Sequence, residues 1–323
     1  MSSAISGRQR SRRIPTAPYP RWHREESSSS SITIACHFRP TYDRSSGGLC
    51  APARHFLRLL SPTVFANAQA QSEAKLPSAP SRDSAIRIVD QIKRADYEGD
   101  RPTLKRLHDQ LTPAPDNKSL ASRELYWRGF ALWRRAINGF NETPTPKDLE
   151  EDLNGAITDF NESLTQDPAF VESKIAEGSC YGYLMYLNMK DPARMQEMIQ
   201  HSSPLLKDAM AAAPDNPRLL WVLGPIRWSS PPERGGGQDK AFELYDRGLA
   251  AIRKSPSATD PLEPAWGEPE LLMNRAWSHL HSTSPDLKAA QSDAAAALAQ
   301  VPYWHYVRDI LMPQIQEAQA KAH

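Results

Sequence analysis

The stretch Ala156-Ile-Thr-Asp-Phe160-Asn-Glu-Ser163-Leu164-Thr-Gln-Asp-Pro168 places small, aromatic, small and proline residues at fixed steps. This spacing predicts a helix whose small residues let a bulky side chain of a partner helix come close, with a proline starting the next unit. Further stretches follow the same steps, the last of them without the proline: Ser202-x3-Leu206-x2-Ala209-Met210-x3-Pro214, Ala290-x3-Ala294-x2-Ala297-Leu298-x3-Pro302 and Ala241-x3-Tyr245-x2-Gly248-Leu249.

Outward from these stretches, apolar residues recur at helical spacing from residue 82 to the end of the chain. No alternating apolar and polar run of useful length predicts a strand, so we expect an all-α fold. A cap followed by proline predicts helix starts at Thr145-Pro146, Asp191-Pro192, Asn216-Pro217 and Ser284-Pro285. The predicted helices span 82–95, 102–111, 119–141, 147–166, 169–188, 192–213, 217–228, 238–254, 269–282, 285–300 and 303–321.

The helices that precede the four stretches carry a small residue of their own. These residues are Gly129, Gly178, Gly224 and Ala276, and apolar or aromatic residues surround them. Together the two kinds of helix resemble the tetratricopeptide repeat (TPR) family, whose pattern has Trp-x2-Leu-Gly-x2-Tyr on a first helix and Ala-x3-Phe followed by Pro on a second. The resemblance covers residues 82–323 and implies about five helical hairpins with a final helix.

The spacing of the repeats departs from that family. The small residues lie 49, 46 and 52 positions apart, whereas family repeats are 34 residues long. We therefore expect TPR-like hairpins that form an irregular α-solenoid or compact helical bundle. The stretch from Trp228 to Ala241, with its Gly235-Gly236-Gly237 step, is also similar to exported bacterial repeat proteins such as the T component of certain solute transporters. From the pattern we expect Gly178 to be a packing position and Gly236 to tolerate a side chain.

The first 75 residues differ from the rest. Residues 1–70 contain ten arginines, no lysine and three acids, without a helical or strand period, which predicts a disordered or targeting segment 1–75 before a helical domain 76–323. This composition fits an organelle transit peptide, a basic arm that contacts anionic partners, and a start codon assigned too far upstream. The apolar stretch 56–70 ends in Ala-x-Ala patterns typical of a signal peptide, with cleavage after Ala68 or Ala70. The sequence leaves open whether the protein is exported, to a periplasm if bacterial, or cytoplasmic.

Composition excludes several classes of function. A net charge of +1 argues against a nucleic-acid binder, and no run of about 18 apolar residues could span a membrane. Three cysteines, Cys36, Cys50 and Cys180, cannot make a disulfide framework or a four-cysteine zinc site. His279 and His281 are two apart and suit no helical metal pair, so we expect no metal and no cofactor. We expect Cys180 to be a small buried residue. No motif of a catalytic nucleophile supports an enzyme.

The resemblance also implies which residues would face a binding groove, because in family members these lie at fixed steps from the first-helix glycine. They are aromatic or arginine side chains, the types that carry binding energy at interfaces. Tyr126, Phe130, Trp133 and Trp228 together are the least readily explained as core. The groove candidates are Arg123, Tyr126, Phe130, Trp133, Arg134, Tyr183, Arg218, Trp221, Trp228 and Trp277.

Two functions fit this reading, and a third is disfavoured. The first is a non-enzymatic interaction module, a scaffold or adaptor that binds a peptide or protein partner through a concave aromatic and arginine groove. The alternative is an exported small-ligand-binding or transporter-accessory protein that holds a small apolar ligand. A helical-domain enzyme is disfavoured because no catalytic motif is present. An open groove would favour the first, and an enclosed pocket the second.

Overall fold

The computed structural model describes residues 82–142, 148–254 and 259–322 of the chain. The predicted targeting or disordered segment 1–75, including the signal-like stretch 56–70, lies outside the described residues. So do Thr145 and Pro146 of the first predicted helix start.

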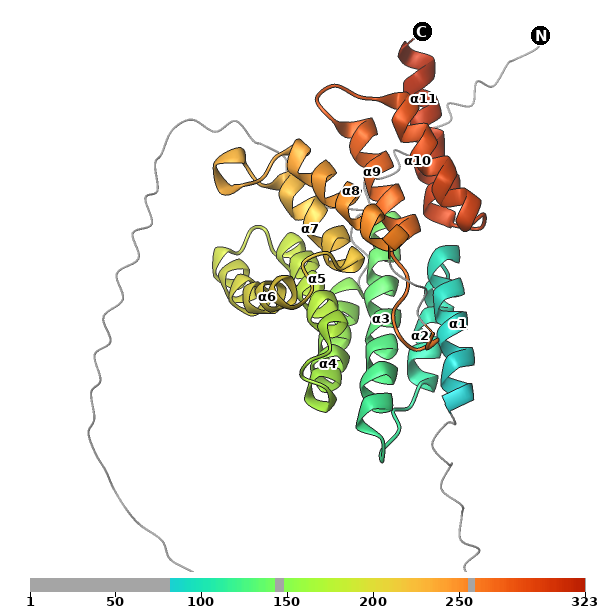
Figure 1. The fold of residues 1–323 in the computed structure, drawn as a ribbon, viewed down its shortest axis with the longest axis vertical. Coiled ribbons are helices and arrows are strands. Elements are labelled where there is room, and N and C mark those ends of the chain that lie inside the picture. The colour runs from blue at the N-terminus through green and yellow to red at the C-terminus, as the bar shows by residue number, and fades with distance from the viewer. Residues whose placement is uncertain (1–81, 143–147, 255–258, 323) are drawn as a thin grey trace, which may run out of the picture. The chain divides into compact units, whose positions relative to one another are not determined.

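Helices make up almost all of the described residues, and those residues contain no strand (Figure 1). The all-α prediction is confirmed, and the predicted helices correspond closely to observed ones. In chain order these are α1 (Arg82–Glu98), α2 (Arg101–Gln110), α3 (Lys118–Glu142), α4 (Leu149–Gln166), α5 (Val171–Leu187), α6 (Pro192–Ala212), α7 (Pro217–Ser229), the short η1 (Pro232–Arg234), α8 (Gln238–Lys254), α9 (Glu268–His281), α10 (Leu287–Gln300), the π-helical turn η2 (Val307–Leu311) and α11 (Met312–Ala322).

Side-chain caps start several helices as predicted. The Asp191 side chain accepts from the backbone N–H groups of the first turn of α6, and Asn216 does the same for α7. Each satisfies N–H groups that have no partner within the helix. The predicted start at Ser284-Pro285 is wrong: the cap of α10 is Asp286, which accepts from the Ala289 N–H at 2.9 Å. Here the acidic side chain one residue after the proline makes the cap.

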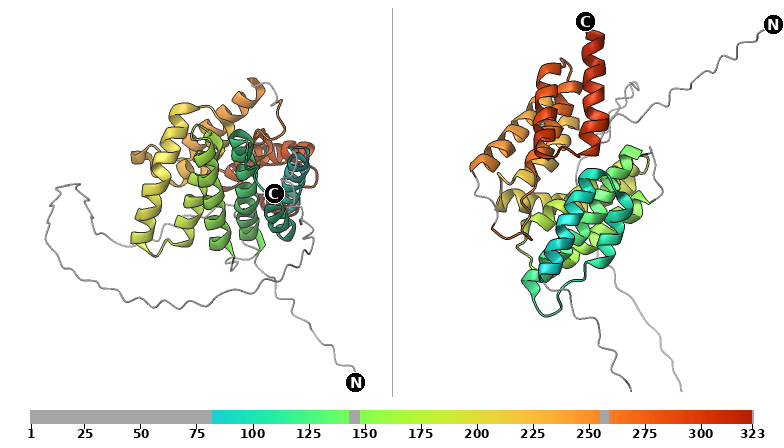
Figure 2. Two further views of the ribbon diagram at one scale, coloured as in Figure 1. Left: turned by 90° about the horizontal axis from the view of Figure 1, so that it is seen from below. Right: turned by 90° about the vertical axis from the view of Figure 1, so that its right-hand side faces the viewer.

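Consecutive helices pack as antiparallel hairpins, α1 with α2, α3 with α4, α5 with α6, α7 with α8 and α9 with α10. The first helix of each hairpin also contacts the first helix of the next, from α1 through α3, α5 and α7 to α9. Figure 2 shows α1 to α6, coloured blue to yellow, side by side in chain order. The five hairpins and final helix of the TPR-like prediction are therefore present, as a solenoid-like all-α array.

The small residues of the first helices touch the bulky residues of the second helices, as the sequence pattern predicts. A Cβ built on these glycines would lie 2.9 Å from the Phe160 ring for Gly129, 2.9 Å from the Leu206 side chain for Gly178, and 2.6 Å from Cζ of Tyr245 for Gly224. Real Cβ atoms essentially never lie within 3.0 Å of such a neighbour, so the glycines allow these hairpins to close. The repeat alignment thus places its packing positions correctly.

The expectation that Gly236 tolerates a side chain is wrong. A Cβ at Gly236 would lie 2.5 Å from the backbone carbonyl carbon of Ser230 and closer still to its oxygen. Backbone atoms cannot rotate away as a side chain can. The turn between α7 and α8 therefore needs glycine here because of space, and at Gly235 and Gly237 because φ is +71° and +114°.

Candidate functional site

The ten predicted groove residues lie in several places. Five of them meet in the interior, mainly along α3 and α7: Tyr126, Phe130, Trp133, Arg134 and Trp221, all buried. Trp228 and Trp277 pair with each other, with ring centroids 5.7 Å apart, and Tyr183 on α5 packs 5.5 Å from the Phe140 ring. Trp277 and Tyr183 are buried and Trp228 is half-buried. The remaining two, Arg123 and Arg218, are half-buried near the beginnings of α3 and α7.

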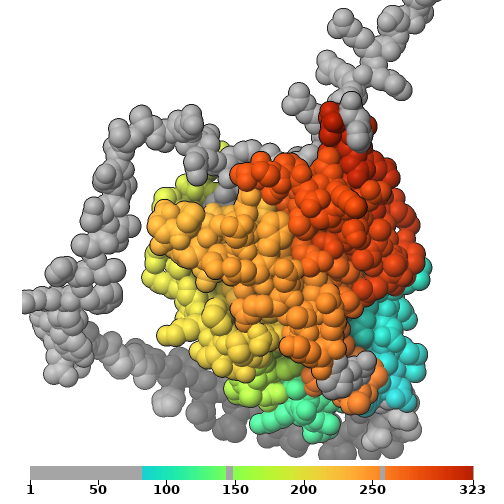
Figure 3. Space-filling model, turned by 45° about the horizontal axis from the view of Figure 1, so that its top comes forward, coloured from blue at the N-terminus to red at the C-terminus, as the bar shows by residue number. Residues whose placement is uncertain are grey.

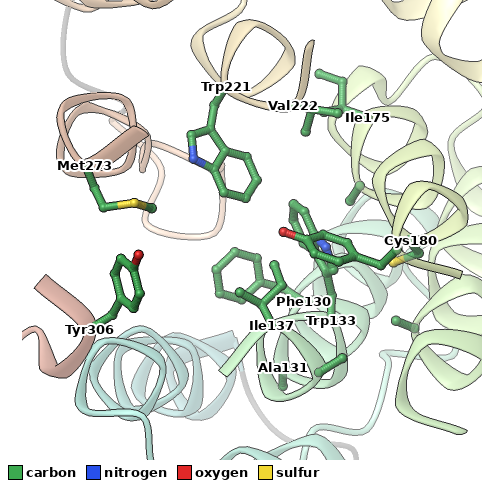
Figure 4. Packing of buried hydrophobic residues seen from close by; sticks show 14 of the residues in the cluster. Phe130, Ala131, Trp133, Ile137, Ile175, Cys180, Trp221, Val222, Met273 and Tyr306 are labelled. Atoms are coloured by element: carbon green, nitrogen blue, oxygen red, sulfur yellow. The ribbon is translucent and has the colours of Figure 1, made fainter. Parts of the chain in front are cut away.

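The aromatic residues of α3 are core in this structure. Tyr126 and Trp133 are 0% exposed and Phe130 is 2% exposed, so three of the four residues least readily explained as core are core, whereas Trp228 is half-buried. The rings of Phe130 and Trp133 lie 5.9 Å apart in an edge-to-face arrangement, and Trp221 of α7 is 5.7 Å from Trp133. Figure 4 shows these rings turned toward the same interior region as Met273 and Tyr306. The first helices therefore do present their aromatic side chains to one another.

This face of α3 and α7 is covered by the chain itself. The connection between α8 and α9 is described for residues 259–267, here called the α8–α9 segment, and it is not helical. Figure 1 shows this stretch, in orange, running alongside α3 and α1, and Figure 3 shows orange atoms against the cyan of α1. Residues far apart in the sequence thereby meet on one surface.

Side chains of α1 and α3 hold the first half of the segment. Asp260 forms an ion pair with Arg82 at the start of α1. The indole N–H of the buried Trp127 donates to the Leu262 carbonyl oxygen at 2.7 Å. Arg123 donates from Nε to Oε1 of Glu263 at 2.7 Å. A main-chain carbonyl and two carboxylates are thus bound by donors that helices α1 and α3 position.

Trp266 fills the middle of the aromatic residues. Its ring centroid is 5.4 Å from Trp221, 5.6 Å from Phe130 and 5.9 Å from Trp133. Its indole N–H donates to the hydroxyl oxygen of Tyr126 at 3.0 Å. Burial raises the pKa of Tyr126 well above its ordinary value, so this hydroxyl stays protonated at every physiological pH. Both the aromatic contacts of its ring and the hydrogen bond of its indole nitrogen therefore hold Trp266 in place.

Arg218 fixes the second half of the segment from α7. One of its nitrogens, Nη1, donates to the Trp266 carbonyl oxygen at 3.0 Å. Its Nε and Nη2 donate to the two carboxylate oxygens of Glu172 on α5, at 2.9 and 2.6 Å. Glu172 also accepts from the Asn216 side chain at 2.6 Å. A bidentate pair of this kind holds the guanidinium in one orientation, so the third donor points at the segment.

A buried group of charges lies beside this aromatic cluster. Arg134 donates from Nε to both carboxylate oxygens of Asp96 at 2.8 Å, and both residues are at most 3% exposed. Glu270 of α9, 1% exposed, accepts from the Tyr97 hydroxyl at 2.6 Å. Burial raises the pKa of Glu270, and the nearby Arg134 charge opposes that rise. The Arg134 guanidinium also lies 5.5 Å from the Trp221 ring, within range of a cation–π contact.

Several buried polar atoms in this region have no hydrogen-bond partner within the described residues. They include Nη1 of Arg134, Oε2 of Glu270, Nε1 of Trp133 and the hydroxyl oxygen of Tyr306. A donor or acceptor that is buried without a partner is destabilising by about 1–3 kcal/mol, so a ligand group that supplied a partner would be stabilising. The interior beside the aromatic rings of α3 and α7 therefore contains polar atoms that could bind a ligand group.

The described residues offer little for metal binding. Within the described ranges, no group of three or more His, Cys, Asp or Glu residues is arranged to hold a metal ion. Cys180 is fully buried as predicted, and burial raises the pKa of its thiol, which favours the unreactive protonated form. Among the helices described, none is long and apolar enough to cross a bilayer.

Sequence analysis missed the residues that complete this face. Trp266 and Leu262 lie in a connection rich in proline, where no helical or strand period marks a contact. The only signal was the presence of a tryptophan and a leucine in an otherwise polar loop. Trp127 lies next to the predicted groove residue Tyr126, but it is not itself among the predicted groove residues.

Comparisons with known proteins add little beyond the fold. No protein-family profile matches this chain, and no curated protein matches it. Its structure is similar to the crystal structure of a thermophilic TPR protein of Thermus thermophilus, with 18% sequence identity and a TM-score of 0.45, over 73% of this chain and 100% of that one. The hairpin pairing and the small-to-bulky contacts of the chain itself make its described part a TPR-like, all-α array of helical hairpins.

Proposed function

We propose that this protein is a non-enzymatic interaction module that binds a non-helical peptide segment of a partner protein on the face made by α1, α3 and α7. The observation that supports this function is that the face already holds a non-helical stretch of polypeptide, the α8–α9 segment, which begins with a turn at Asp260–Glu263. Arg123, Trp127 and Arg218 supply donors, and Phe130 and Trp221 supply ring surfaces.

The division of contacts suits peptide recognition. Trp127 and Arg218 donate to main-chain carbonyl groups, which every peptide has, so these two contacts give affinity without selecting a sequence. Arg123 selects a carboxylate, and the aromatic rings select a flat apolar side chain. Aromatic and arginine residues of this kind carry most of the binding energy at protein interfaces.

Selection from a random peptide display library against the full-length protein tests this function. We expect peptides to be enriched whose binding weakens at least about tenfold with Arg123→Ala, a loss typical of an interface arginine. The matched control is Arg247→Ala, because Arg247 is an exposed α8 residue that pairs with Asp215 away from this face. The proposal is wrong if no peptide is enriched, or if both variants bind the enriched peptides equally well.

A second candidate function is binding of a small ligand, as in an exported or transporter-accessory protein. The buried atoms without partners, on Arg134, Glu270 and Trp133, favour it, because a ligand with a polar group among the aromatic rings would satisfy them. A thermal-shift screen with small aromatic acids and amides distinguishes the two functions. Stabilisation that Arg134→Met abolishes would support the small-ligand function over the peptide function.

A further inference from the structure

We propose that residues 259–267 occupy the peptide-binding face in cis, and that the partner segment is a non-helical, acidic, tryptophan-bearing peptide that takes their place. This inference rests on the proposed function, and it adds the chemistry of the partner and the way in which access to the face is controlled. The chemistry of the partner segment is inferred from residues 259–267, which bind to this face in the structure.

The length of the connection sets this segment apart from the other connections between helices. Thirteen residues separate the end of α8 from the beginning of α9, whereas four residues connect α5 to α6 and four connect α6 to α7. A turn of four residues would be enough to start the next helix. Long connections without secondary structure are uncommon in compact domains and usually have a function.

The charges on the face select an acidic occupant. Arg82, Arg123 and Arg218 come from three different helices, and each meets an oxygen of the segment. Two of these oxygens belong to carboxylates, those of Asp260 and Glu263. Arg123 also pairs with Asp167 of the chain, and Arg218 pairs with Glu172. A partner segment with acids at the same places would meet Arg82 and Arg123, whereas a basic segment would lose both of these ion pairs.

The apolar contacts select the remaining positions. Leu262 is 0% exposed, and the Trp266 ring lies among Phe130, Trp133 and Trp221. An apolar residue followed at once by an acid, and then by tryptophan three positions after the acid, therefore describes the occupant. The indole N–H of such a tryptophan would donate to Tyr126, as that of Trp266 does.

The segment is attached in a way that allows it to leave. Within the described residues, its main chain makes no hydrogen bond to the main chain of α1, α3 or α7, and side chains make every hydrogen bond that joins it to them. Its junction with α9 is Gly267, whose φ of +138° only glycine adopts readily. Releasing the segment breaks side-chain contacts and no backbone ladder, and regions of this kind open locally without global unfolding.

A peptide with the sequence of residues 259–268, labelled with a fluorophore, tests the inference in trans. Because a short tether gives the segment an effective concentration on the order of millimolar, the unmodified protein should bind this peptide weakly. Trp266→Gly weakens the cis occupant and leaves the face intact, so it should bind the peptide at least about tenfold more tightly. A peptide with alanine in place of the tryptophan should bind neither protein. Equal binding by the two proteins, or none, overturns the inference.

Hydrogen exchange on the unmodified full-length protein decides the matter if Trp266→Gly does not fold. The amides of Leu262, Glu263, Ala265 and Trp266 should exchange at least about tenfold faster than those of the α3 core, through local opening. Exchange at the same rate as α3 would mean that the segment is released only on global unfolding, which overturns the inference.

Two outcomes separate this inference from the proposed function. A library-selected peptide that binds the unmodified protein without changing exchange at these amides would preserve the proposed function and overturn the cis occupancy. A dimer of the unmodified protein, detected by light scattering and dissociated by the 259–268 peptide, would make a second copy the occupant and overturn the partner assigned here.

Discussion

Gly224 of α7 lies against the ring of Tyr245 of α8, so closely that a Cβ on Gly224 would be 2.6 Å from the Tyr245 Cζ. Tyr245 is only 2% exposed, so its ring is enclosed by other residues of the core. Here a glycine in the interior of a helix, which lowers helix stability by about 1 kcal/mol relative to alanine, is compensated by the close packing of a hairpin. The same relationship joins Gly129 to Phe160 in the α3–α4 hairpin.

We expect Gly224→Ala to destabilise the protein by about 1–3 kcal/mol, because the new methyl group forces the Tyr245 ring out of its position. Urea unfolding, followed by circular dichroism, measures the change. The matched control is Gly182→Ala, since Gly182 also lies inside a helix, α5, but a Cβ there has nothing within 4 Å. Gly182→Ala should be neutral or stabilising by up to about 1 kcal/mol. Equal effects at the two glycines would contradict the packing explanation.

The ion pair between Arg134 and Asp96 is buried, and we expect its removal to be strongly destabilising. Asp96→Ala leaves a guanidinium in the interior without its carboxylate, which typically lowers stability by about 3–5 kcal/mol. The control Lys105→Ala breaks the exposed pair with Asp109 on α2, where about 0.5 kcal/mol or less is expected. Thermal and urea unfolding of both variants beside the parent decide the prediction. It is wrong if Asp96→Ala is as mild as Lys105→Ala.

The sequence predicted those features that a local period encodes. Each helix is marked by apolar residues three and four apart, and each hairpin by a small residue facing a bulky one, as Gly178 faces Leu206. Two of the helix caps, Asp191 and Asn216, could be read directly because a proline follows each of them.

The sequence did not predict what covers the aromatic face. The resemblance to a repeat family implied a binding groove, and several of the side chains that it selected converge, among them Phe130, Trp133 and Trp221. Their burial depends on Trp266, which lies in a loop without any helical or strand period. Trp266 comes more than 130 residues after Phe130 and Trp133 in the chain, and 45 residues after Trp221. Contacts of that kind arise from tertiary packing alone. Gly236 was misjudged for a similar reason, since the obstacle is the backbone of Ser230.

The segment before the helical domain gives a prediction from sequence alone. A protein that begins at residue 76 should melt at the same temperature as the full chain, because residues 1–75 carry no period that could supply a buried face. Differential scanning calorimetry compares the two proteins. A drop of several degrees would require the loss of about 1 kcal/mol or more of packing, and would show that the earlier residues contribute to the fold.

Glu177 of α5 makes the stability of the protein depend on pH near neutrality. Its side chain is 4% exposed, its Oε2 has no hydrogen-bond partner within the described residues, and burial raises its pKa to about 7 from an ordinary 4.5. Because the folded-state pKa is the higher one, the folded protein holds this proton more tightly than the unfolded chain does. The charged form therefore destabilises the fold progressively as the pH rises from 4.5 to about 7, and by a constant amount above that.

Glu177→Gln should remove this dependence. The raised pKa corresponds to about 3 kcal/mol at most, so the glutamine variant should be more stable than the parent by up to that amount at pH 8 and nearly equal to it at pH 4.5. Urea unfolding at the two pH values measures the difference, and Glu162→Gln on the exposed side of α4 controls for the loss of one charge. A stability difference that is the same at both pH values would mean that Glu177 is charged and satisfied in the folded protein, by a group that approaches its second carboxylate oxygen.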